Sequence, residues 1–338
     1  MKAIAVVGLD LAKQVFQIHG LDAEGGVVIR RQMRRSEVLK FFSSLPPCLV
    51  GMEACASAHY WARELMVFGH RVRLMPPHYV KPYVKRSKTD AADAEAIAEA
   101  VTRPTMRFVA VKTVDQQAVL MLHKTRDLLV RQRTMLINAL RGHLAEYGII
   151  AAKGPAGMGA LKTNLSEAQE MLPPLAWVAM QGFTNQLRSL EIEIECIETQ
   201  ILRWHRADPV SRRLVTIPGI GPITASAMAA AVPDASLFRS GRQFAAWLGL
   251  TPRAYSSGGR ERQAGISKQG DGYLRRLLVV GAIAVMRMAR QSAVPRLWLM
   301  ELLEHKRPKV VAVALANKTA RIAWAIMTRN QIYAARAA

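Results

Sequence analysis

Residues 4–10 read IAVVGLD, a short apolar run that is rich in β-branched side chains and ends in an acid. The run VFQIHGL follows at residues 15–21, and after the turn-forming DAEGG a third run, VVIRRQM, begins at residue 27. Runs of this kind, separated by Gly and Asp, are typical of neighbouring strands joined by tight turns. We therefore predict a meander of three strands at the start of the chain.

Helix-like and strand-like runs alternate after this meander. SEVLKFFSSL fits a helix with Ser36 as its N-cap, and CLVGME, residues 48–53, is a second apolar run that ends in an acid. A helix closed by Gly69 follows, and after it the strand-like run HRVRLM. This alternation predicts a mixed α/β sheet domain over residues 1–110.

Two long helical patterns occupy the middle of the chain. Apolar residues recur near every seventh position over residues 113–147, and a second long pattern spans residues 175–206 after the glycine-rich break AKGPAGMGA. Such a pair is typical of an antiparallel coiled coil or of an oligomer interface, and pattern alone does not choose between them. We assign residues 111–209 to this helical region and residues 210–330 to a second, mostly helical domain. The predicted fold class is α/β plus α.

The chain is strongly basic. It has 47 Lys and Arg residues against 25 Asp and Glu, a net charge of +22 over 338 residues. A globular chain with this excess most often binds a polyanion, usually nucleic acid. Its three cysteines are widely spaced and form no C-x-x-C pair, which suits the cytoplasm and argues against a disulfide framework or a zinc site. The apolar run LLVVGAIAVM is about half as long as a bilayer requires, so we expect no membrane anchor.

Four acidic residues of this basic chain stand at the ends of predicted elements, in the order strand, strand, helix. Asp10 and Glu53 each end an apolar run, and Asp90 and Asp93 lie three residues apart in the helical stretch TDAADAEAIAEAV. That spacing puts both side chains on one face of a helix. Carboxylates gathered in one place repel one another unless a hard cation neutralises them, and Mg²⁺ prefers oxygen ligands and serves phosphoryl transfer. Helix capping and the helix dipole are the alternative explanation of Asp90 and Asp93.

A serine pair lies in the basic stretch TPRAYSSGGR. Ser256 and Ser257 precede two glycines. A serine hydroxyl attacks a phosphodiester when a base or a metal activates it and cations stabilise the developing charge, although a Ser/Gly turn is the commoner use of such a sequence. The basic side chains of this region that we expect to contact nucleic acid are Arg253, Arg260, Arg262 and Lys268.

The stretch IPGIG places Gly219 and Gly221 around a short turn between helical runs. Backbone N–H groups in a glycine-rich hairpin can hold a phosphate without reading sequence. A tight helix–helix turn is the alternative, and both glycines remain candidates for nucleic-acid binding.

Five stretches, taken in order, resemble the DEDD-type transposases of insertion-sequence family one-ten, which are relatives of the Piv DNA invertase. They are GLDLAKQVFQIHGLD, VGMEACASAHYWARELMVFGHRVRLMPP, RSKTDAADAEAIAE, IPGIGPITA and FAAWLGLTPRAYSSGG. The resemblance covers residues 4–328. It implies a RuvC-like, ribonuclease-H-like domain, then a helical coiled coil, then a C-terminal transposase domain.

By motif position, the resemblance places the catalytic metal set on Asp10, Glu53, Asp90 and Asp93 and the catalytic serine on Ser257. The adjacent Ser256 leaves that last assignment open by one residue. The implied chemistry uses Mg²⁺ on the acids to position the scissile phosphate, which the serine attacks to form a transient phosphoserine link before strand exchange. After Glu53 the chain reads ACASAHYW, where many relatives have a Thr-Gly pair and an aromatic, and we still expect metal binding.

The resemblance also implies partners. These are donor and target DNA, a structured non-coding guide RNA, and further copies of the chain in a dimer or tetramer whose active sites combine acids and serine from different protomers. Two other functions fit the residues alone. A metal-dependent nuclease of the Holliday-junction type would use the acids without the serine, and a basic packaging protein would need neither.

Overall fold

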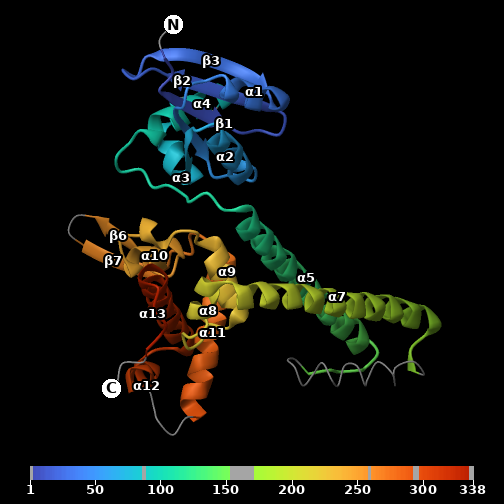
Figure 1. The fold of residues 1–338 in the computed structure, drawn as a ribbon. Coiled ribbons are helices and arrows are strands. Elements are labelled where there is room, and N and C mark those ends of the chain that lie inside the picture. Colours follow the sequence, from blue (N-terminus) through green and yellow to red (C-terminus); the bar gives the residue numbers. More distant parts are fainter. Residues whose placement is uncertain (1–2, 86–88, 153–170, 258–259, 292–296, 335–338) are drawn as a thin grey trace. The chain divides into compact units, whose positions relative to one another are not determined.

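The computed structural model describes residues 3–85, 89–152, 171–257, 260–291 and 297–334. The chain divides into two compact units, Met1–Thr113 with Val232–Leu237 and Val114–Ala231 with Phe238–Ala338. The first is an α/β unit and the second is mostly helical (Figure 1), which confirms the α/β plus α fold class. The finer division at residues 110 and 209 stays a prediction, as does the likeness of the first unit to RuvC.

The first unit is built on a five-stranded mixed sheet in the order β3-β2-β1-β4-β5. β1 pairs antiparallel with β2 and parallel with β4, and β5 is parallel to β4. The three-strand meander is confirmed as β1, β2 and β3, and the two later strand-like runs are β4 and β5. The strands are β1 (Val6–Asp10), β2 (Val15–Leu21), β3 (Val27–Arg34), β4 (Leu49–Glu53) and β5 (Arg71–Met75).

Helices of this unit pack on the sheet and form two apolar cores. Val7 and Leu9 of β1 belong to the core that includes residues of α1 and α2, whereas a second cluster forms around α4. The predicted N-cap Ser36 is wrong, because Ser36 lies inside a 3-10 turn whose entry is closed by a bond from Arg34 N to Glu37 Oε2 at 2.9 Å. The helical elements are η1 (Arg35–Glu37), α1 (Val38–Ser43), α2 (Ala58–Val67), α3 (Pro77–Val80), η2 (Lys81–Tyr83), α4 (Asp90–Val101) and η3 (Ala235–Leu237).

Glycine at position 8 lets α4 lie directly on the sheet. A Cβ added at Gly8 would lie 2.1 Å from the carbonyl oxygen of Ala94 and 2.5 Å from the backbone nitrogen of Ala98, both in α4. At Gly51, the register partner of Gly8 on β4, a Cβ would lie 2.8 Å from Cβ of Val101. The absence of these two side chains therefore sets how closely the helix approaches β1 and β4.

We predict that Gly8→Ala lowers the free energy of unfolding by about 1–3 kcal/mol, because α4 must move away from the sheet to make room for a methyl group. Urea unfolding of the full chain measures this change. Gly142→Ala in α5 is the matched control, since a Cβ there meets nothing within 4 Å and alanine favours a helix interior by up to about 1 kcal/mol. An unchanged midpoint for Gly8→Ala would contradict the close packing described above.

The second unit contains two long helices, a group of shorter helices and one β-hairpin (Figure 1). The two long helical patterns are confirmed as α5 and α7. The part of the chain after them is mostly helical, as predicted, and the stretch that contains Ser256 and Ser257 forms a β-hairpin between two of its helices. The elements are α5 (Val114–Ala145), α7 (Pro174–Ala207), α8 (Pro209–Leu214), α9 (Pro222–Ala231), α10 (Gly241–Trp247), β6 (Pro252–Ser257), β7 (Arg260–Ile266), α11 (Gly272–Gln291), α12 (Leu297–His305) and α13 (Pro308–Arg329).

α5 and α7 run in opposite directions. Arg126 Nε of α5 donates to Glu198 Oε1 of α7 at 2.7 Å, and further along α5 Leu140 shares an apolar cluster with Met180 from the earlier part of α7. The antiparallel pairing is as expected, whereas supercoiling and an oligomer interface stay predictions. Nearly all of the glycine-rich break between the two helices lies outside the described residues.

α13 is long and apolar enough to cross a membrane by length and composition alone. It also packs against α10 and α11 within the second unit. The residues that it buries there are Val311, Ala312, Leu315, Ala316, Thr319, Ala320, Ala323 and Ile326. A core helix of a globular unit has the same composition, so the apolar character of α13 is explained by this packing.

His123 of α5 joins three helices through a buried polar contact. Its Nδ1 lies 3.0 Å from the Tyr273 hydroxyl of α11, and its Nε2 lies 3.1 Å from Ser226 Oγ of α9. Ser226 donates its single hydroxyl proton to the Pro222 carbonyl at 2.8 Å, so His123 donates from Nε2 and accepts from Tyr273 at Nδ1. The neutral ring therefore fits this position. Burial, together with the charge of Arg126, lowers the pKa of His123 from 6.5 to about 4.

This lowered pKa predicts a loss of stability in acid. The contribution of His123 is fully present above pH 6.5 and falls as the pH drops from 6.5 to 4, because over that range the unfolded chain binds a proton that the folded chain excludes. The loss reaches about 3 kcal/mol. Urea unfolding of wild type and His123→Gln at pH 7 and pH 4.5 tests it: the advantage of wild type over the variant should shrink in acid. An equal difference at both pH values would show that the ring does not titrate in this way.

Candidate active site

Asp10 and Glu53 lie next to each other at one edge of the sheet. β1 and β4 are parallel, and Leu9 is in register with Met52, so the residues that follow them end neighbouring strands on the same side. Both acids are half-buried. Each stands two positions beyond a glycine that faces α4, and residues two apart on a strand face the same way. The strand pairing therefore places both carboxylates on the α4 side of the sheet.

The first turn of α4 supplies the other two acids. Thr89 caps the helix, since its Oγ1 accepts a bond from Ala92 N at 3.2 Å. The capping role therefore belongs to Thr89 rather than to Asp90, which begins the helix in an exposed position. Asp93 lies one turn later and is half-buried. Asp90 and Asp93 thus share one face at the positive end of the helix dipole, as their spacing predicted.

Three of the four predicted acids meet. Carboxylate oxygens of Asp10, Asp90 and Asp93, which we call the acidic cluster, all lie within 4.8 Å of one another. Glu53 lies beside Asp10 at the strand ends but outside this group. The structure thus brings together residues that are eighty positions apart in the sequence.

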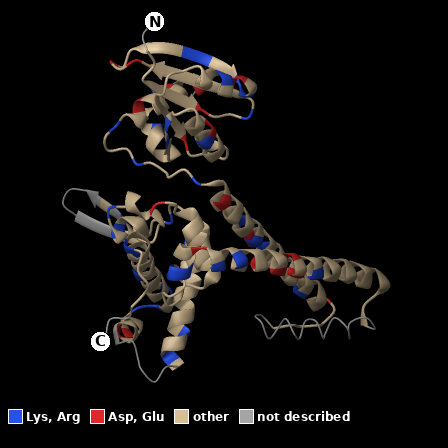
Figure 2. Ribbon diagram, viewed as in Figure 1, with Lys and Arg blue, Asp and Glu red and all other residues tan. Residues whose placement is uncertain are grey.

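The donor set fits a hard divalent cation. All of its ligand atoms are carboxylate oxygens, and opposite ligands of an octahedral Mg²⁺ lie about 4 Å apart, only slightly closer than the oxygens of the acidic cluster. Like charges at such distances disfavour the folded state unless a cation compensates them. Lys and Arg residues are spread over both units (Figure 2), so three acids that gather at one point stand against the overall charge of the chain.

We predict that Mg²⁺ or Mn²⁺ raises the thermal unfolding temperature of the wild-type chain and that Asp93→Asn removes this effect, with at least about a tenfold loss of metal affinity. Without metal, Asp93→Asn should unfold at the same or a higher temperature than wild type, because one repelling charge is gone. Asp115→Asn, at an exposed aspartate outside the cluster, is the control and should keep the metal effect. A metal response that survives in Asp93→Asn would contradict a metal site at the acidic cluster.

The serine pair lies at the end of a β-hairpin in the second unit. β6 and β7 pair antiparallel, with Ser256 opposite Glu261 and Ser257 opposite Arg260, and we call this element the serine hairpin. The tip at residues 258–259 lies outside the described residues. The side chains of both serines, Arg260 and Arg262 also lie outside them, so their roles stay predictions.

Two of the predicted basic residues stand at the base of the serine hairpin. Arg253 is exposed, and its guanidinium donates to the Ser267 carbonyl at 2.9 Å. Lys268 is exposed and has a left-handed backbone with φ of 57°, and its backbone N–H donates to the Gly249 carbonyl at 3.1 Å. Both side chains are therefore displayed to solvent by a defined backbone, and their contact with nucleic acid stays a prediction.

The two glycines of IPGIG have different surroundings. Gly219 has φ of +88°, and a Cβ there would lie 2.9 Å from Val285 Cγ2 and 3.0 Å from the carbonyl oxygen of Gly281 in α11. Packing against α11 thus accounts for glycine at position 219. Gly221 precedes α9, and a Cβ there would meet nothing within 4 Å. Open space for a ligand exists at Gly221, although phosphate binding by either glycine stays a prediction.

A hollow in the first unit, lined by Tyr79 and Tyr83, was not predicted from the sequence. The only signal in the sequence was the pair of tyrosines within PPHYVKPYVK, residues 76–85. The opposite wall, at residues 105–107, comes from a later segment. Spacing within PPHYVKPYVK could not predict that residues 105–107 lie opposite its tyrosines.

Comparison with known proteins gives matches over both units. Residues 7–149, which contain all four acids, match the DEDD transposase family of IS110, described as "Transposase". Residues 211–295, which contain the serine hairpin, match the family described as "Transposase IS116/IS110/IS902 family".

Individual relatives align along most of their length. The chain is 52% identical over 330 residues to a "Probable family 20 transposase" of Pseudomonas aeruginosa, which covers 97% of this chain and 98% of the relative. It is 41% identical over 334 residues to the "Transposase for insertion sequence element IS1328" of Yersinia enterocolitica, with 98% and 99% covered. It is also 26% identical over 288 residues to the "Pilin gene-inverting protein" of Moraxella bovis, with 82% and 79% covered.

Proposed function

Since the chain belongs to the IS110/IS116/IS902 family of DNA transposases, we propose that it cuts and rejoins DNA with its acidic cluster and the serine of its hairpin. The observation that carries this proposal is the meeting of Asp10, Asp90 and Asp93 at the sheet edge. The cluster lies in the first unit and the serine hairpin in the second, so each unit brings one part of the chemistry.

In the proposed reaction the acids hold the metal and the serine makes the covalent link. Asp10, Asp90 and Asp93, with Glu53 beside them, would bind Mg²⁺, which neutralises phosphate charge and orients the scissile bond when bound. Ser257 Oγ forms a bond to phosphorus as the bond from phosphorus to a deoxyribose oxygen breaks, and the hydroxyl proton passes to the released oxygen or to solvent. A deoxyribose hydroxyl of a second strand then attacks the phosphoserine, which rejoins DNA and frees the serine.

The partners follow from the charge and from the family. We propose that donor and target DNA and a structured guide RNA occupy the basic surface, with target choice left to base pairing. We further propose a dimer or tetramer in which one protomer supplies the acids and another the serine, a division that the two-unit organisation allows. The reaction would take place in the cytoplasm, with no membrane involved.

A metal-dependent nuclease of the Holliday-junction type is the second candidate. The acidic cluster is complete within the first unit and needs no residue of the serine hairpin, which is the observation that favours it. Such an enzyme would use water and leave no covalent intermediate. A packaging protein is disfavoured, because three converging carboxylates would weaken rather than help the binding of phosphate.

We predict that wild type, incubated with donor and target DNA, RNA transcribed from the flanking DNA and Mg²⁺, yields DNA covalently attached to protein on a denaturing gel. Ser257→Ala should abolish the adduct, because the attacking oxygen is gone, whereas the neighbouring Ser256→Ala should retain it. Loss of the adduct only in Ser256→Ala would move the nucleophile by one residue. Cleavage by wild type without any adduct would establish the water-using nuclease instead.

A further inference from the structure

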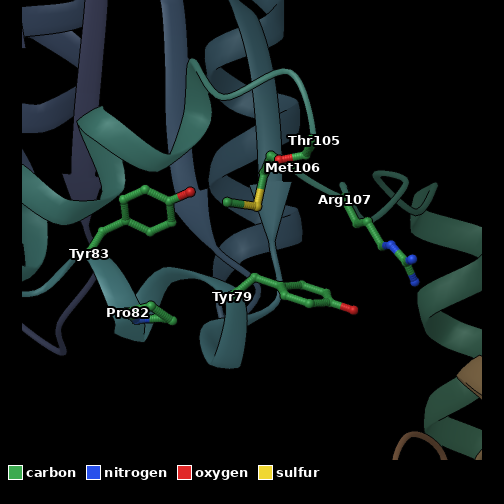
Figure 3. Close-up of a pocket in the computed structure, with 6 residues that line it drawn as sticks. All are labelled: Tyr79, Pro82, Tyr83, Thr105, Met106 and Arg107. Atoms are coloured by element: carbon green, nitrogen blue, oxygen red, sulfur yellow. The ribbon is translucent and has the colours of Figure 1, made fainter. Parts of the chain in front are cut away.

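A hollow of about 520 Å³ lies in the first unit, and none of the four candidate acids lines it. Figure 3 shows its lining, which we call the tyrosine hollow. Its residues are Tyr79, Pro82, Tyr83, Thr105, Met106 and Arg107. Two segments form it, because β5 continues into α3 and η2 while Val109 pairs antiparallel with Leu74 of β5 and brings the preceding residues alongside. Its size is in the range of pockets that take small molecules.

The lining of the tyrosine hollow offers flat apolar surfaces that pack on the core of the first unit. Tyr83 and Met106 are half-buried and pack against the core cluster around α4. The Met106 side chain points toward the Tyr83 ring, and the Tyr79 ring lies on its other side (Figure 3). The ring of His78 lies against Tyr79, with 4.1 Å between the ring centroids. Aromatic faces and a thioether in this arrangement suit a planar ring system.

Positive charge lies at the rim of the same hollow. The guanidinium carbon of Arg107 lies 6.0 Å from the Tyr79 ring centroid, and that of Arg103 lies 5.9 Å from the Tyr83 ring centroid. Arg103 is paired with Glu99 at 2.5 Å. Arg107 is exposed and has no carboxylate partner within the described ranges. A planar pocket with an available guanidinium at its edge matches a base joined to a phosphate.

The tyrosine hollow and the acidic cluster lie at the same edge of the sheet. β1, β4 and β5 are parallel, so their carboxyl ends lie side by side and lead to Asp10, Glu53 and the α3 segment respectively. Strands are spaced about 4.8 Å apart, which puts the ends of β1 and β5 about 10 Å from each other. The hollow follows the end of β5, so one nucleic-acid strand that runs along this edge can reach both places.

We propose that the tyrosine hollow takes one unpaired base of the DNA strand whose phosphate the acidic cluster holds. Tyr79 and Tyr83 stack on the base, and Arg107 pairs with an adjacent phosphate. The hollow thereby fixes which phosphate of the strand reaches the acids. This inference rests on the proposed function, because it assumes that DNA is bound at the acidic edge of the sheet.

The experiment uses the full chain and a single-stranded DNA of roughly 12 nucleotides that carries one 2-aminopurine, with Ca²⁺ in place of Mg²⁺. Stacking in the hollow should quench the 2-aminopurine fluorescence. Tyr79→Leu should abolish the quenching and weaken binding by about 5-fold to 150-fold, the range for loss of one stacked base. Tyr79→Phe should keep both, and so should Tyr147→Leu, which removes an exposed tyrosine of the second unit.

A second strand with an abasic site at the same position separates base recognition from other effects. The abasic site should weaken binding to wild type by the same factor as Tyr79→Leu and should cause no further loss in that variant. If base-containing and abasic strands bind wild type equally, or if Tyr79→Leu weakens both equally, the hollow takes no base and the proposal fails. That result would leave a protein segment or a small molecule as the occupant.

Arg107→Gln keeps the test valid if Tyr79→Leu does not fold, because Arg107 is exposed. It should weaken binding and reduce the slope of log affinity against log salt by about 1, yet leave the quenching of the saturated complex unchanged. Full affinity in Arg107→Gln would overturn the phosphate contact. If wild type forms the serine adduct but does not quench the 2-aminopurine fluorescence, base binding in the hollow is wrong and the proposed function stands. If wild type quenches the fluorescence but forms no adduct, the serine chemistry is wrong and base binding in the hollow stands.

Discussion

The contact between α4 and the sheet is the interaction on which the candidate site depends. Two neighbouring strands present glycine to the helix: Gly8 faces the backbone of α4 directly, and Gly51 makes room for the Val101 side chain. The close approach brings the first turn of α4 to the end of β1. Asp10, Asp90 and Asp93 are thus held by regular secondary structure rather than by a loop, and a site built on such elements keeps its geometry better than one built on loops.

The acidic cluster contrasts with the strongly basic charge of the chain. A basic surface attracts phosphate in general, whereas metal-dependent phosphoryl transfer needs carboxylates at one point. In the structure three acids meet at one edge of the sheet, whereas Lys and Arg residues are spread over both units (Figure 2). The acidic cluster belongs to the first unit, and the serine hairpin belongs to the second.

Much of the fold could be predicted because it depends on local period and composition. The meander, the alternating strands and the two long helices all follow from such patterns. Features that depend on distant contacts could not be predicted. The spacing of Asp90 and Asp93 showed a shared face, but their meeting with Asp10 depends on a backbone contact at Gly8. The role of Gly219 was ambiguous in the sequence because its packing partner, Gly281, lies in a helix much further along the chain.

The buried contact at His123 fixes α5 near one end, so a change of tilt there would displace its other end. Hydrogen bonds to Tyr273 and Ser226 fasten the helix to α9 and α11 near its beginning. At a rise of about 1.5 Å per residue, the part of α5 from His123 to Ala145 extends about 33 Å beyond that contact. Over that length, a tilt of α5 by about 5° at His123 would move Ala145 by about 3 Å. Because α7 packs along α5, as far as Leu140 near its end, such a tilt would have to move both helices together.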